Sequence, residues 1–228
     1  MHSSYKRTTE ALFELAGVKI NGDNPWDIRV HNEDFYRRIM TEVELGLGES
    51  FMDGWWDCEK LDLICRKLYL EPGMRILDIG CGWGPFGKYA AEKFKVEVVG
   101  ITVSKQQVEL GRKLCHGLPV EFRLLDYREL DEKFDRIFSI GMFEHVCYQN
   151  YRTFFRVAAR CLRDDGLFLL HTIGNYRSVK TTDLWTKKYI FPVWMIPSIA
   201  QVGKAIEKLF MMEDWHNFGL DYDKTLMA

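Results

Sequence analysis

Short apolar runs alternate with amphipathic segments between residues 61 and 172. The apolar runs predict five strands, at 75–79, 96–101, 120–125, 134–140 and 167–172. The amphipathic segments predict helices at 61–70, 85–94, 104–115 and 151–162, the last ended by residues 164–166. Strands separated by helices of this length form a doubly wound, mostly parallel sheet, so we predict an α/β fold. On such sheets ligands bind at the carboxyl ends of the strands.

The first sixty residues have a less regular pattern and predict a small mixed module. Its predicted parts are a helix at 9–16, a tight turn at Asn21-Gly22, a strand at 26–30, a helix from Asn32 to Met40 and a flexible turn at 45–48. Asn-Gly is a strong turn signal, and Asn32 precedes two acidic residues, as a helix-capping residue does. We therefore divide the chain into an N-terminal module, residues 1–60, and a core, residues 61–228.

A glycine-rich loop follows the first strand of the core. Residues 77–84 are Leu-Asp-Ile-Gly-Cys-Gly-Trp-Gly. Glycines let the backbone approach a ligand closely, although a tight turn without a ligand is the alternative. A dinucleotide site would require G-x-G-x-x-G and an acidic residue at the end of the second strand. The spacing here is G-x-G-x-G, and Thr102 stands at the end of the second strand, so NAD is disfavoured.

The loop resembles the first motif of S-adenosylmethionine-dependent methyltransferases, which implies a class I, Rossmann-like core. Thr102 and Gln107 can donate and accept hydrogen bonds and so bind the ribose diol. Gln107 also lies three residues after Ser104, as in a helix-capping box, and both interpretations stay open. Asp126 can accept from the adenine amino group and Tyr127 can stack on the ring, with a turn residue and a surface tyrosine as the alternatives.

Composition limits the classes of function. Hydrophobic residues make up 47% of the chain, charged residues 28%, and the formal net charge is -2, so we expect no nucleic-acid partner. The six cysteines include no C-x-x-C pair, which disfavours a metal site or a disulfide framework and predicts a reducing, cytoplasmic compartment. The sequence contains no run of 18 apolar residues, so we predict no membrane-spanning helix.

Several motifs along the chain narrow the family. They lie in order at 46–56, 99–107, 134–146, 168–174, 188–192 and 212–219. Together they resemble cyclopropane-fatty-acyl-phospholipid synthases and mycolic acid cyclopropane synthases, over nearly the whole chain. The resemblance implies that the chain transfers a methylene group from S-adenosylmethionine to the cis double bond of unsaturated phospholipid acyl chains, forming cyclopropane fatty acids.

The resemblance also implies a set of site residues. Family members hold a bicarbonate ion, the proposed base, with a Glu, a His, a Tyr and backbone groups, and these match Glu144, His171, Tyr222 and Ile173. A solvated loop glutamate and a structural histidine are the alternatives. The residues that we expect to bind the cofactor are Asp78, Gly80, Cys81, Gly82, Trp83, Gly84, Thr102, Val103, Gln107, Asp126 and Tyr127.

The longest strongly apolar run, residues 189–197, follows Lys187 and Lys188. It could line an acyl channel, rest on a membrane surface or form a buried lid. We expect membrane phospholipid as the partner, peripheral contact with the membrane from the cytoplasm, and a homodimer. Cys81 and Cys147 are interpreted as small apolar fillers rather than nucleophiles.

Two departures from the family pattern leave three hypotheses open. Family members carry a long segment between the leading domain and the core, whereas here the two join at residues 61–64, and family members continue beyond Ala228. The absent stretches help to cover the cofactor, so we expect weaker cofactor binding and little turnover. The hypotheses are a working synthase, an impaired form that only binds cofactor, and a methyltransferase for another lipid or small acceptor.

Overall fold

The structure is a computed structural model that describes residues 2–15, 18–22, 27–181, 184–189 and 194–217. Contacts within the chain divide it into two compact units, one formed mainly by Met1–Arg66 and the other by Lys67–Glu213. The functional boundary that we place at residue 60 stays a prediction. In the described part of the chain, no helix is both long enough and apolar enough to cross a bilayer.

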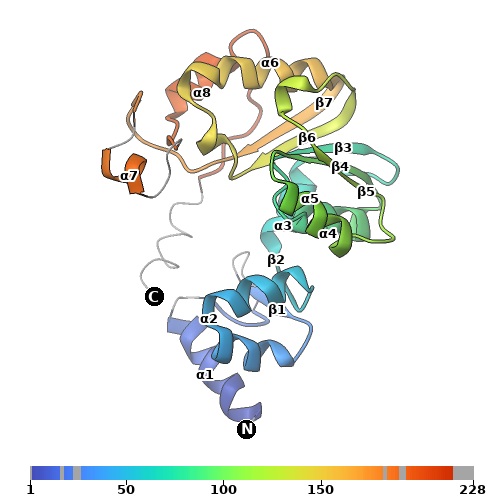
Figure 1. The fold of residues 1–228 in the computed structure, drawn as a ribbon, viewed down its shortest axis with the longest axis vertical. Coiled ribbons are helices and arrows are strands. Elements are labelled where there is room, and N and C mark those ends of the chain that lie inside the picture. The colour runs from blue at the N-terminus through green and yellow to red at the C-terminus, as the bar shows by residue number, and fades with distance from the viewer. Residues whose placement is uncertain (1, 16–17, 23–26, 182–183, 190–193, 218–228) are drawn as a thin grey trace. The chain divides into compact units, whose positions relative to one another are not determined.

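The five predicted strands form one parallel sheet in the second unit, in the order β5-β4-β3-β6-β7 (Figure 1). They are β3 (Arg75–Ile79), β4 (Glu97–Thr102), β5 (Val120–Leu124), β6 (Phe134–Ile140) and β7 (Leu162–His171). The chain adds β4 and β5 on one side of β3 and then returns to add β6 and β7 on the other. The doubly wound α/β prediction is confirmed, and the strand order reverses between β3 and β6, where such sheets bind ligands.

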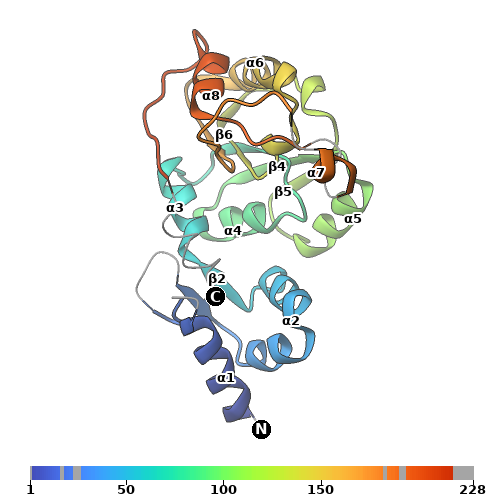
Figure 2. The same cartoon turned by 90° about the vertical axis from the view of Figure 1, so that its left-hand side faces the viewer.

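Helices cover both faces of this sheet, as Figures 1 and 2 show from two sides. One face carries α4 (Pro85–Phe94) and α5 (Lys105–Leu114), and the other carries α6 (Tyr151–Cys161) and α8 (Ile199–Ile206). Shorter elements of the unit are η1 (Tyr127–Glu129), η2 (Phe143–His145), η3 (Tyr148–Asn150) and α7 (Leu184–Tyr189). Each sheet face is therefore buried, which explains why the strand sequences are nearly continuous apolar runs.

Successive side chains of each strand point to opposite faces of the sheet, and each face has its own hydrophobic cluster. Leu77 of β3 and Val99 of β4 are buried in one cluster with Phe154 and Phe155 of α6. On the opposite face, Phe122 of β5 packs in a second cluster beneath α5. The period-2 geometry of a strand thus fixes which residues meet which helix layer.

The end of α6 and the start of β7 differ from the prediction. Residues 164–166 were expected to end the helix and precede the strand, but they lie inside β7. Leu162 pairs with Phe134, and the next paired residues are Arg136 and Leu167, so β7 carries a bulge between them. Asp-Asp-Gly is not paired with β6 and forms this bulge, so regular pairing of β7 starts at Leu167, where the strand was predicted to begin.

The first unit is small and mixed, as expected. Its elements are α1 (His2–Leu15), β1 (Ile28–Val30), α2 (Asp34–Met52), β2 (Trp56–Cys58) and α3 (Glu59–Lys67), and β1 and β2 pair antiparallel. The predicted flexible turn at 45–48 lies inside α2, which stays helical there but changes direction. A Cβ atom on Gly46 would lie 2.6 Å from the carbonyl oxygen of Arg38. Residues eight apart are about 12 Å apart along a straight helix, so α2 bends here.

Candidate active site

The glycine loop after β3 has one face that is open. Gly80, Gly82 and Gly84 all have positive φ angles, of 87°, 55° and 87°. A Cβ on Gly84 would lie 2.2 Å from the Phe122 ring, and one on Gly80 would lie 2.6 Å from Met142. A Cβ on Gly82 would meet nothing within 4 Å. Gly80 and Gly84 are therefore required by packing, whereas Gly82 leaves room for a ligand.

Hydrogen bonds within the unit tie this loop to β4. The amides of Gly80 and Cys81 both donate to the carbonyl oxygen of Ile101, and the Gly84 amide donates to Cys81. The Cys81 side chain is buried, and burial raises the pKa of its thiol well above the usual range. A thiol in this state is a poor nucleophile, which supports its interpretation as a small apolar filler.

Asp78 places a carboxyl group beneath the loop. It is the fourth residue of β3 and only 4% of its surface is exposed. Burial raises the pKa of Asp78 to about 8, because the charged form loses its hydration. A cationic group of a bound ligand would favour the ionised carboxylate, so this residue fits the sulfonium and ammonium groups of S-adenosylmethionine.

The raised pKa of Asp78 predicts that cofactor affinity depends on pH. Because the neutral form dominates below about pH 8, we expect the affinity to rise about 25-fold between pH 6.5 and 8.5, with release of a proton on binding. Calorimetry in buffers of different ionisation enthalpy measures both quantities. An Asp78→Asn variant should lose this dependence, and an unchanged profile in the variant would contradict the assignment.

The raised pKa of Asp78 also determines how the stability of the fold changes with pH. The native state retains the Asp78 proton to about pH 8, whereas the unfolded chain loses it near pH 4, so this group destabilises the fold progressively as the pH rises across that window. The difference in unfolding free energy between the wild type and Asp78→Asn should therefore move in favour of the variant as the pH is raised. Chemical denaturation at several pH values provides the comparison.

Polar residues after β4 show how Gln107 is used. The Ser104 hydroxyl caps α5 by accepting from the Gln107 amide N–H. The Gln107 side chain does not complete a capping box, since its Oε1 accepts from the Thr102 hydroxyl at 2.5 Å. This leaves the Gln107 side-chain NH2 as the donor group that it can offer to a diol. Half of the capping interpretation is correct, and the diol interpretation stays a prediction.

Two residues after β5 are engaged within the chain. The Asp126 carboxylate accepts from the Arg128 guanidinium at 2.6 and 2.9 Å and from the Arg128 amide at 3.0 Å, which lowers its pKa. The Tyr127 ring is partly buried and meets Phe154 edge-on, with centroids 5.3 Å apart. The turn role expected as the alternative for Asp126 is present, whereas the surface alternative for Tyr127 is wrong, because its ring packs against the core. Adenine contacts by this pair would have to share these groups.

The loop after β6 and the end of β7 meet at Glu144. Only 4% of Glu144 is exposed, and its Oε1 accepts from the Ile173 amide at 2.8 Å. Its backbone carbonyl accepts from the amide of Met195 at 2.8 Å, which anchors a later segment over it. Oε2 is buried and has no hydrogen-bond partner among the described residues. Glu144 is therefore a buried, hydrogen-bonded residue rather than a solvated loop residue, and its role in the site stays a prediction.

Other predicted site residues lie near the same sheet edge. His171 is the last residue of β7, and its carbonyl oxygen accepts from the Gly141 amide beside β6. Trp83, Val103 and Ile173 follow β3, β4 and β7 and are exposed, by 40%, 77% and 55% respectively. Tyr222 lies outside the described residues. Exposed apolar side chains at the carboxyl ends of parallel strands are typical of a ligand-binding edge.

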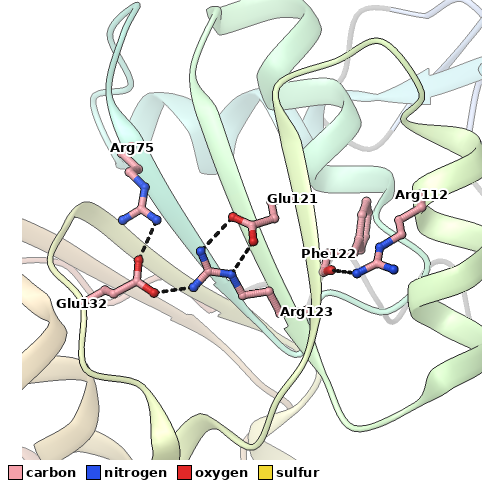
Figure 3. Close-up of polar contacts among 6 residues, drawn as sticks. All are labelled: Arg75, Arg112, Glu121, Phe122, Arg123 and Glu132. Carbon is pink, nitrogen blue, oxygen red and sulfur yellow. Dashed lines mark hydrogen bonds and ion pairs between the residues drawn. The ribbon is translucent and has the colours of Figure 1, made fainter.

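A groove of about 420 Å³ lies elsewhere, at the first residues of β3, β4 and β5. Figure 3 shows the ion pairs beside it: Glu132 binds both Arg75 and Arg123, and Arg123 also binds Glu121. Arg75 and Glu121 of its lining are therefore neutralised by ion pairs. The groove is on the amino-end edge of the sheet, so it is a poor candidate for the site. Among the described residues, no His, Cys, Asp or Glu cluster is arranged to hold a metal ion.

Comparison with known proteins decides the family. Residues 56–228 match the family model described as mycolic acid cyclopropane synthetase. The chain belongs to this family. This chain is 38% identical to the cyclopropane-fatty-acyl-phospholipid synthase of Escherichia coli (strain K12). The match covers 99% of this chain and 81% of the E. coli protein.

Mycobacterial family members match about three quarters of this chain. Cyclopropane mycolic acid synthase 3 of Mycobacterium tuberculosis is 40% identical over 73% of this chain and 64% of its own length. The crystal structure of mycolic acid cyclopropane synthase CmaA1 complexed with SAH and CTAB has a TM-score of 0.66 and 35% identity, covering 74% of this chain and 66% of that one. The methyltransferase fold prediction is thereby confirmed.

The E. coli match also shows a length difference inside the family. It spans 309 positions, whereas 99% of this 228-residue chain is 226 residues, so about 80 positions of the relative have no counterpart here. This agrees with the expected shortening of the chain. Its location at residues 61–64 stays a prediction.

Two features were missed in the sequence. The helix α8 was not predicted, although Ser198 and Gln201 form a complete capping box whose sequence signal is local. Tyr151 was assigned only to a helix, yet its hydroxyl is buried near Glu144. No local signal marks that hydroxyl, because its importance depends on what surrounds it.

Proposed function

We propose that this chain transfers a methylene group from S-adenosylmethionine to cis double bonds of unsaturated phospholipid acyl chains, forming cyclopropane fatty acids. The observation that carries this proposal is the 38% identity to the E. coli synthase along 99% of the chain. The open Gly82 face after β3 and the buried Glu144 after β6 lie on neighbouring strands, at the edge where this fold binds ligands.

The cofactor supplies an electrophilic methyl carbon when bound. We infer that Gly82 allows its close approach, that Asp78 offers a carboxylate to its positive charge, and that the Gln107 side-chain NH2 donates to its ribose. Because an alkene is a weak nucleophile, the chain must align the acyl double bond and exclude water. These cofactor contacts are proposals that the variants below test.

The residues around Glu144 fit a small base such as bicarbonate. Ring closure requires loss of a proton, and bicarbonate when bound would supply a weak base. Glu144 Oε2 is a buried acceptor without a partner among the described residues, and an ion that carries an O–H group would satisfy it. We infer that Glu144, His171 and the Ile173 backbone hold the ion, with Tyr222 as an additional predicted ligand.

An impaired form that only binds cofactor is the second candidate. The observation that favours it is the shortening by about 80 positions relative to the E. coli synthase. Incubating the chain with methyl-labelled S-adenosylmethionine and vesicles of unsaturated phospholipid separates the two. Label in the acyl chains supports the synthase, and vesicles of saturated phospholipid serve as the control. Cofactor binding without transfer supports the impaired form, and label in a different acceptor would overturn both.

We infer that the chain reaches its lipid through peripheral membrane contact by a basic-aromatic segment, defined as residues 176–181 and 184–189. Four large side chains are well exposed there, namely Tyr176, Leu184, Trp185 and Tyr189. Arg177 lies over the Tyr176 ring and Lys188 over the Tyr189 ring, at 5.1 and 4.9 Å. Aromatic rings mixed with basic groups suit the interface of an anionic bilayer. Within the run at 189–197, Met195 is instead buried in the core.

Replacing both Trp185 and Tyr189 by serine should weaken vesicle binding about tenfold, because two interfacial aromatic anchors are lost. Co-sedimentation with vesicles containing phosphatidylglycerol measures this. Trp215→Ser is the matched control, since Trp215 is also exposed but lies outside the segment. Equal binding by the double variant would contradict the proposed surface. The expected homodimer stays a prediction that analytical ultracentrifugation can test.

A further inference from the structure

The hydroxyl of Tyr151 is a buried polar group near the proposed base site. Tyr151 is only 1% exposed, and its hydroxyl oxygen has no hydrogen-bond partner among the described residues. Its ring stacks on Phe143, the residue before Glu144, with centroids 4.4 Å apart. Buried polar groups in native proteins are almost always satisfied, so one without a partner calls for a ligand or a function.

Two such unsatisfied atoms occur together here. Burial raises the pKa of the Tyr151 hydroxyl to about 12, and the charge of the nearby Glu144 adds a smaller part of the shift. Glu144 Oε2 is the other unsatisfied atom, and the two groups do not bond directly to each other. An ionised carboxylate can only accept, and a phenol at neutral pH can donate. A group that bridges them must therefore carry both an O–H donor and an acceptor oxygen.

We propose that the Tyr151 hydroxyl is a further contact of the small oxyanion at Glu144, donating to one of its oxygens while the oxyanion's own O–H donates to Glu144 Oε2. This inference rests on the proposed function, since it concerns the same base site. Bicarbonate has the required pattern, with one O–H donor and two further oxygens. Tyr151 is thus a positioning residue, because it fixes the ion and does not touch the reacting carbons.

The test measures binding of the ion without turnover. Wild-type protein in buffer freed of carbon dioxide is titrated with sodium bicarbonate at constant pH and ionic strength, and the unfolding temperature is followed. A ligand that binds only the native state raises this temperature in a saturable way. We expect this for bicarbonate and not for nitrate, a planar anion of the same charge that has no O–H donor for Glu144.

A Tyr151→Phe variant should need at least about ten times more bicarbonate for the same rise, because one hydrogen bond to the ion is lost. Without bicarbonate, the variant should unfold at a temperature equal to or above that of the wild type, since it removes an unsatisfied hydroxyl. If the hydroxyl had a merely structural role, the variant would unfold at a lower temperature than the wild type in the absence of bicarbonate. Tyr148→Phe is the matched control, because Tyr148 packs edge-on against Tyr151, and it should retain the wild-type response.

Three outcomes would overturn the inference: no response of the wild type to bicarbonate, an equal response to nitrate, or a Tyr151→Phe response equal to that of the wild type. Failure of the proposed function has a different signature. In that case the bicarbonate response and its loss in Tyr151→Phe remain, but labelled S-adenosylmethionine transfers nothing to unsaturated vesicles.

Discussion

Replacing Glu144 by glutamine should lower methylene transfer by about 100-fold or more, the usual cost of disabling acid–base catalysis. The variant keeps an oxygen that can accept from the Ile173 amide, so the local fold is retained. It replaces the buried Oε2 acceptor by an NH2 donor, which repels the O–H of a bound ion. Initial rates with labelled S-adenosylmethionine and unsaturated vesicles measure the effect.

Glu129→Gln is the matched control for this variant. It makes the same change of charge on an exposed residue of η1, and it should leave the rate unchanged. Affinity for S-adenosylmethionine should stay within about twofold in Glu144→Gln, because the residue is not expected to contact the cofactor. Full turnover by Glu144→Gln would remove Glu144 from the base site.

Alanine at two glycines of the β3 loop should produce two different defects. Gly84→Ala should destabilise the fold by about 2–5 kcal/mol, from the left-handed backbone and from overpacking. The new Cβ would lie 2.2 Å from the Phe122 ring, which is 1% exposed and has no room to move. Urea denaturation measures the loss.

Gly82→Ala should cost only about 1 kcal/mol of stability, because its Cβ points into open space. It should nevertheless weaken S-adenosylmethionine binding at least about tenfold, since the methyl group occupies the face that we assign to the cofactor. Isothermal titration calorimetry of the folded variant tests this. Wild-type affinity in Gly82→Ala would show that the nucleoside does not approach this loop.

Features that depend on local sequence were predicted well. The bounds of β3, α4 and β6 agree with the prediction, because each apolar or amphipathic run is delimited by Gly, Pro or charged residues. Because these bounds were correct, the glycine loop and the residues that follow each strand could be placed at the carboxyl-end edge of the parallel sheet. The observed bounds differ from the prediction at α2, which continues through the predicted turn and bends at Gly46, and at β7, whose first residues precede a bulge that holds Asp-Asp-Gly.

By itself, the sequence determined the order of the elements, the parallel sheet, the glycine loop and the family, since these follow from periodicity and from motifs of adjacent residues. Only the tertiary structure decided which polar atoms meet. It joins the Glu144 carboxylate to the Ile173 amide across 29 residues. It also buries the Tyr151 hydroxyl beside Glu144. Hydrogen bonds require particular distances and angles, and these arise only when distant segments pack together.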